Sequence, residues 1–114
     1  MDLNQFLSNL NSQPNEINFA DTMAVIDECY EFTPTAFTNG DVNNEANQNN
    51  GSCKIFAFGL LNNLSKQQTL ACFGDYYRQD VLQNPDGDDH QNIRHFIKSG
   101  WIGIKFEAIA LNAK

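Results

Sequence analysis

The first part of the chain carries hydrophobic residues at helical spacing. Apolar side chains recur every three or four positions in residues 2–10, which predicts a short amphipathic helix that ends before Pro14. A second apolar stripe over residues 19–29 predicts a second helix. Asn18 and Asp21 stand three positions apart at its start, so Asn18 is expected to cap it.

The middle of the chain predicts a buried helix followed directly by another. Residues 53–64 are apolar on most faces, which is typical of a helix surrounded by the core, and Ser52 is expected to cap it. Ser65 and Gln68 have capping-box spacing, so the next helix should begin there and end at Gly74.

The following segment is polar and broken by turn residues. Residues 75–82 are expected to add one or two helical turns, and residues 83–88 contain the Pro and Gly of a tight turn. Asp88 and Gln91 predict a capping box for a last helix, which should stop at Gly100.

Two extended segments predict a small antiparallel β unit. Residues 31–38 alternate and include Pro34, which favours an edge strand. Residues 102–111 alternate in polarity, so one face should be buried. Its inward positions would be Ile102, Ile104, Phe106, Ala108 and Ala110. The fold class expected is therefore α+β: one mostly helical small domain over residues 1–114, with these two strands paired.

The Asn-rich loop over residues 39–51 is either functional, mobile or the product of compositional bias.

Charge narrows the classes of partner. The 114 residues include 7 Lys and Arg against 14 Asp and Glu, which gives a net charge of −7. Nucleic-acid backbones are bound mainly through Lys and Arg, so a nucleic-acid partner is not expected.

The longest apolar run, residues 55–61, is far shorter than the roughly 20 residues of a membrane span, so membrane insertion is not expected. The start of the chain lacks the features of a secretory signal, which favours the bacterial cytoplasm. The partner expected is an unidentified protein or small molecule.

The cysteines and aspartates do not form a metal or disulfide pattern. Cys29, Cys53 and Cys72 are odd in number and widely spaced, without a CxxC motif. The aspartates of residues 86–89 lack the Gly and Glu positions of an EF-hand, and turn and cap chemistry accounts for them. No metal and no cofactor is expected.

Six short strings, in order and along nearly the whole chain, resemble one family. They are residues 21–27 (DTMAVID), 32–40 (FTPTAFTNG), 51–54 (GSCK), 74–78 (GDYYR), 89–94 (DHQNIR) and 100–104 (GWIGI). The chain resembles the HopJ family of type III effectors, the Hrp outer proteins of plant-pathogenic bacteria. The resemblance implies delivery into a host cell through an injectisome. It implies no activity and no catalytic residues.

Cys53 is the candidate nucleophile. Its predicted place in the first turn of a helix would lower the pKa of the thiol. His90 could then act as base, oriented by Asp75, Asp80 or Asp89, in a Cys–His–acid arrangement. The alternative is a buried structural thiol.

His90 and Arg94 are four residues apart, on one helical face. Together with Arg78 they could bind a carboxylate or phosphate. The alternative is that Arg94 pairs with a nearby aspartate and locks the turn to the fold.

Aromatic side chains complete the candidate ligand-binding group. Tyr76 and Tyr77 lie between Asp75 and Arg78 and could stack on a ligand ring, or one ring could pack inward. Trp101 could line a pocket or fill the joint between the last helix and strand. The function expected is binding of a partner or ligand by a HopJ-type protein. The alternatives are a small cytosolic enzyme using Cys53 with His90, or a housekeeping small-molecule-binding domain.

Overall fold

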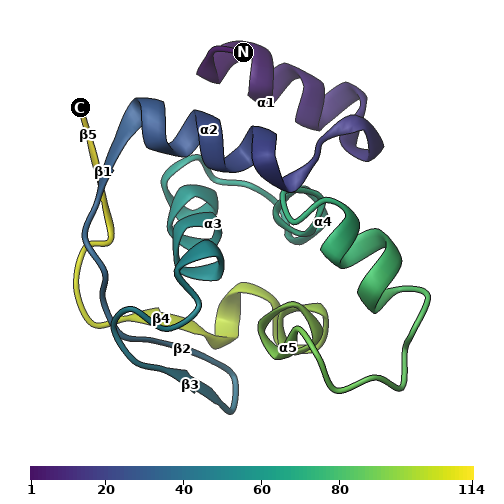
Figure 1. Ribbon diagram of the computed structural model, residues 1–114. Coiled ribbons are helices and arrows are strands. Elements are labelled where there is room, and N and C mark those ends of the chain that lie inside the picture. Colours follow the sequence, from purple (N-terminus) through teal and green to yellow (C-terminus); the bar gives the residue numbers. More distant parts are fainter.

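The computed structural model describes all 114 residues and shows helices packed around a central helix, with two small sheets on one side (Figure 1). The helices are α1 (Leu3–Ser12), α2 (Phe19–Cys29), α3 (Asn50–Leu61), α4 (Lys66–Ala71) and α5 (Gln91–Ser99). Three short helical segments join them, the 3-10 turns η1 (Pro14–Glu16) and η3 (Gly100–Gly103) and the π-helical η2 (Tyr76–Val81). The α+β fold class expected from the sequence is confirmed.

Helix α3 occupies the middle of the molecule, as its apolar faces predict (Figure 1). Phe56 and Phe58 on this helix are fully buried. The ring of Phe56 contacts those of Phe37, Phe73, Phe96 and Trp101, which come from four other parts of the chain. The phenylalanines therefore form the core that holds the helices in place.

Two segments pair antiparallel, as expected, but each is split into two short strands. β1 (Tyr30–Phe32) pairs with β5 (Leu111–Ala113), and β2 (Phe37–Asn39) pairs with β4 (Ile104–Phe106). A further strand, β3 (Val42–Asn44), pairs with β2 in a hairpin, within the segment expected to be a loop. The sheet order β3-β2-β4 places this hairpin beside α5.

The predicted buried face of residues 102–111 is wrong at two of its five positions. Ile102 lies in η3 and is 90% exposed, because the chain is still turning there and the alternation begins only at Ile104. Ala108 is also exposed, because it lies in the irregular segment between β4 and β5.

Gly100 is the C-cap of α5 as predicted, whereas α4 ends at Ala71, before the predicted stop at Gly74. Both glycines have φ of 61°. A Cβ at Gly74 would also lie 2.7 Å from the backbone nitrogen of Phe19, so glycine permits a close approach to the start of α2.

Candidate functional site

The five α-helices fall into two groups, according to whether a side chain accepts hydrogen bonds from their first N–H groups. Those amides have no carbonyl partner within a helix. In α1, α2 and α4 the N-cap side chains of Asp2, Asn18 and Ser65 accept them, and each start is a complete capping box. In α3 and α5 the N-cap residues Asn49 and His90 make no side-chain capping bond. The starts of α3 and α5 are therefore open to other acceptors.

Two caps predicted from the sequence are wrong for the same reason. Ser52 lies inside the first turn of α3, and Asp88 lies before the true N-cap of α5. The residues at the N-cap positions, Asn49 and His90, have left-handed φ values of 54° and 50°. A capping side chain normally extends from a β-region backbone, so this geometry leaves neither helix with a side-chain cap.

A cavity of about 470 Å³ lies where α3 and α5 begin. It combines aromatic rings with polar side chains and main chain. Its lining residues are Phe19, Val42, Asn49, Gly51, Ser52, Phe73, Tyr76, His90, Gln91, Asn92 and Ile93. A volume in this range is typical of small-molecule sites.

Unused backbone donors border this cavity from both helices. The first backbone bond of α3 runs from the amide of Cys53 to the carbonyl of Asn49, and that of α5 from Arg94 to His90. The amides of residues 50–52 and 91–93 have no acceptor within the chain, and all of these residues except 50 line the cavity. The positive ends of two helix dipoles thus meet at one hollow.

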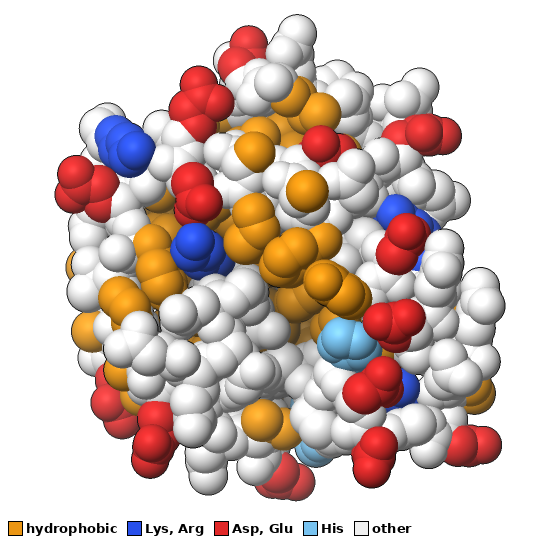
Figure 2. All heavy atoms as spheres, viewed as in Figure 1, with side chains coloured by type: hydrophobic (Ala, Val, Ile, Leu, Met, Phe, Trp, Pro, Cys, Tyr) orange, Lys and Arg blue, Asp and Glu red, His pale blue; other side chains and the backbone are white.

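An aromatic wall closes one side of the cavity. The ring of Tyr76 lies 5.2 Å from that of His90 and 5.0 Å from that of Phe19, measured between centroids. A Cβ at Gly51 would lie 2.9 Å from the ring of Phe19, so the absence of a side chain there lets that ring reach α3. Figure 2 shows hydrophobic side chains at the surface, where a strip of them ends beside a histidine flanked by acidic groups.

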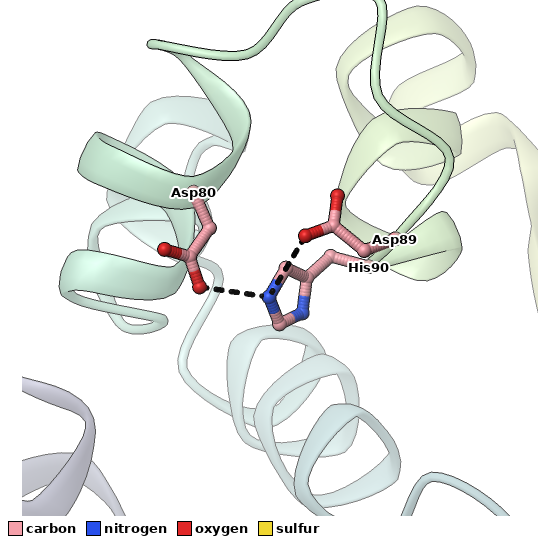
Figure 3. Close-up of side chains that lie close together, drawn as sticks. All are labelled: Asp80, Asp89 and His90. Atoms are coloured by element: carbon pink, nitrogen blue, oxygen red, sulfur yellow. Dashed lines mark hydrogen bonds and ion pairs between the residues drawn. The ribbon is translucent and has the colours of Figure 1, made fainter.

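His90 stands between two carboxylates (Figure 3). Its Nε2 is 3.0 Å from Oδ2 of Asp80, on η2, and 3.8 Å from Oδ2 of Asp89, the residue before it. Of the three acids considered as partners of His90, Asp75, Asp80 and Asp89, the structure places Asp80 and Asp89 beside it. The His90 side chain remains 29% exposed and borders the cavity.

Buried asparagines tie the two open helix starts together. Asn44, on β3, accepts a hydrogen bond from Nδ2 of Asn49 at 2.7 Å and from Nδ2 of Asn92 at 2.9 Å. Asn39, on β2, donates to the backbone carbonyl of Asn92 at 2.7 Å. Because Asn49 occupies the N-cap position of α3 and Asn92 lies in the first turn of α5, this asparagine network fixes both starts to the hairpin.

The group that the sequence suggested as one site is divided in the structure. Tyr76 and His90 share the cavity at α3 and α5, whereas Tyr77 and Arg78 line a second cavity of about 540 Å³ on the side of α1 and α4. The guanidinium of Arg78 donates to the carbonyls of Pro14 and Ile17, so it holds the α1–α2 connection. Although this second cavity is larger, its cation is engaged by the protein.

Arg94 locks the turn before α5, which is the second of the two roles considered for it. Only 9% of the residue is exposed, and its guanidinium donates to the carbonyls of Asn84 and Asp89 and to the Asp89 carboxylate. That hydrogen bond from Arg94 holds the pKa of Asp89 below its ordinary value. Arg94 and His90 therefore meet at Asp89 rather than at a shared anion.

Trp101 fills a joint, and Asp75 stays at the surface. The indole Nε1 of Trp101 donates to the carbonyl of Leu64 at 2.9 Å, and its ring lies where a Cβ at Gly59 would stand. Asp75 lies 3.6 Å from Arg78 and does not line the cavity.

Cys53 does not line the cavity either. It is 1% exposed in the core, and its Sγ lies 3.9 Å from the carbonyl oxygen of Thr35. Burial raises the pKa of Cys53, opposite to the direction that an activated nucleophile needs. The alternative of a buried structural thiol fits this position.

Sequence reasoning missed the asparagines and the open helix starts. Asn44, Asn49 and Asn92 show no spacing that marks a network, because β3 and α5 meet only in the fold. The one available signal was the concentration of Asn in residues 39–51.

Comparisons with known proteins agree with this architecture. The family model of the HopJ type III effector protein matches residues 3–111, so the chain belongs to the HopJ family. It is similar to a solved structure titled "Crystal structure of unknown function protein VPA0580", with 63% identity and a TM-score of 0.99. That match covers 100% of this chain and 95% of the other. None of the curated proteins compared with the chain matches it. No helix is both long and apolar enough to cross a membrane.

Proposed function

We propose that this HopJ family protein binds a small molecule that carries a flat ring and a hydrogen-bond-accepting group. The observation that carries the proposal is the cavity at α3 and α5, where an aromatic wall faces unused donors. The ring of the ligand would pack against Tyr76, and its acceptor group would lie at the amides of residues 51–52 and 91–93.

The contrast between the two cavities supports this choice. Around the second cavity, Arg78 already donates to backbone carbonyls. At the first, the five main-chain donors of residues 51–52 and 91–93 have no partner in the protein, and dipoles of two helices favour an acceptor with negative charge. The nearby carboxylates of Asp80 and Asp89 oppose a highly charged anion, so a ring with a single carboxylate suits the site better than a polyphosphate.

Nuclear magnetic resonance titration tests the proposal directly. Benzoate is the probe, and benzyl alcohol is its neutral control. We expect benzoate to shift the amide resonances of residues 51–52 and 91–93, and benzyl alcohol to shift them much less. Shifts confined to the second cavity around Tyr77, or no saturable shifts, would contradict the proposal.

A pair of variants separates binding from folding. Tyr76→Ala should weaken benzoate binding about tenfold, because it removes the ring on which the ligand packs. Leu82→Ala is the matched control, since Leu82 is exposed and does not line the first cavity. Equal weakening in both variants would place the ligand elsewhere.

Family membership supports a second proposal, that the protein is exported as an effector into a host cell. A translocation reporter fused after the full chain, with and without a working type III apparatus, tests it. Reporter entry that is the same in both strains would contradict export by this route.

A further inference from the structure

Three ligand-type atoms converge at the rim of the cavity. They are Nε2 of His90 and one carboxylate oxygen each of Asp80 and Asp89, and all lie within 4.8 Å of one another (Figure 3). They come from two places in the chain, η2 and the residues just before α5, so the fold itself brings them together.

We propose that Asp80, Asp89 and His90 bind a divalent transition-metal ion such as Zn²⁺. Imidazole nitrogen and carboxylate oxygen are both ordinary zinc ligands. One nitrogen with two oxygens suits zinc better than calcium, which takes six to eight oxygen ligands. Three protein ligands also correspond to a zinc site with an open position, rather than a closed structural one.

The two distances from His90 suit such an ion with small side-chain movements. Two ligands bound at about 2.1 Å to one zinc ion stand roughly 3.0–3.4 Å apart. The observed separations from His90 Nε2 are 3.0 Å to Asp80 and 3.8 Å to Asp89. All three side chains are partly exposed, so they can adjust and the ion can enter from solvent.

The neighbouring cation leaves these ligand atoms available. Arg94 engages Oδ1 of Asp89, whereas Oδ2 of Asp89 faces His90. Arg94 also anchors the backbone before α5 through the carbonyls of Asn84 and Asp89. It therefore orients the Asp89 carboxylate while the second oxygen stays free for the ion. A metal here would lie beside the cavity, because His90 lines it.

Isothermal titration of the full-length protein with Zn²⁺ alone tests the site, using protein without a histidine tag. We expect one ion per chain, with the His90 imidazole resonances shifting in step. His90→Asn should weaken binding at least tenfold, and asparagine tolerates the left-handed backbone at this position. His95→Asn, which alters the other histidine of the chain, is the matched control and should change binding less than twofold.

A second variant keeps the test independent of folding at the helix start. Asp80→Asn alters a half-exposed side chain and should also weaken Zn²⁺ binding at least tenfold. Zinc binding that survives both His90→Asn and Asp80→Asn would overturn the proposal, as would absence of binding at about 1 mM Zn²⁺. Because metal alone is the probe, these outcomes do not depend on benzoate binding.

Discussion

The helix starts of α1, α2 and α4 differ from those of α3 and α5, although all five face the same problem of unpaired amides. The first three solve it with a side chain from their own sequence, in capping boxes at Asp2, Asn18 and Ser65. The other two leave their amides open, and both open starts border one cavity. A locally satisfied start stabilises the fold, whereas an open start keeps donors available for a ligand.

The largest expected effect is a difference in thiol reactivity. It tests whether the open amides of α3 serve the cavity or activate Cys53. If the open amides serve the cavity, Cys53 gains no activation and reacts only when the core opens. We expect iodoacetamide to modify half-buried Cys29 at least about a hundredfold faster than Cys53 at neutral pH. Mass spectrometry of timed samples measures both rates. Equal rates would show that the start of α3 activates its own cysteine.

The asparagine network should carry the largest stability effect among the polar residues of the two open starts. Asn44→Ala leaves the side-chain amides of Asn49 and Asn92 without their acceptor, two of the contacts that hold α3 and α5. We expect a loss of about 2–3 kcal/mol in the free energy of unfolding, measured with urea. Asn43→Ala, one residue away on the same strand and exposed, should cost less than about 0.5 kcal/mol. Similar costs for both variants would mean that the network does not hold the helices.

The two kinds of helix start also explain what could be predicted from the sequence. The start of α2 follows from Asn18 and Asp21, because a capping box consists of two residues three positions apart. The start of α3 could not be predicted, since its left-handed N-cap Asn49 is held by Asn44 on a strand of another element. Ser52 was therefore a reasonable cap by local rules and a wrong one in the fold.

The candidate site shows the same limit. An aspartate beside His90 could be considered from the sequence, because Asp75, Asp80 and Asp89 lie close to it along the chain. The separation of Tyr76 from Tyr77 was not, since adjacent side chains on η2 face different cavities. The π-helical turn and its packing against α4 and α5 decide which tyrosine reaches His90.

The next test compares two serine variants, for which the largest expected loss of stability is about 1 kcal/mol. Ser65→Ala removes a real cap and should destabilise the protein by about 1 kcal/mol. Ser52→Ala should change stability by less than about 0.3 kcal/mol, because Ser52 does not cap α3. Thermal or urea unfolding compares the two directly. A full cap cost at Ser52 would show that α3 is closed by its own sequence, like α2.

The smallest expected effect is the pH dependence of the stability that Asp89 contributes in the turn before α5. The hydrogen bond from Arg94 lowers the pKa of Asp89 in the folded protein, so this carboxylate stabilises the fold above its unfolded pKa of roughly 3.9. That contribution disappears as the pH falls through the lower, folded-state pKa. Asp89→Asn should therefore be less stable than the parent at pH 6, and the gap should shrink toward pH 3. Asp88→Asn alters an exposed neighbour that forms no ion pair, and it should show no such narrowing in urea unfolding at the two pH values. Since Asp89 is at the surface, solvent screens the effect, and a gap independent of pH would mean that Arg94 holds the turn through the backbone carbonyls alone.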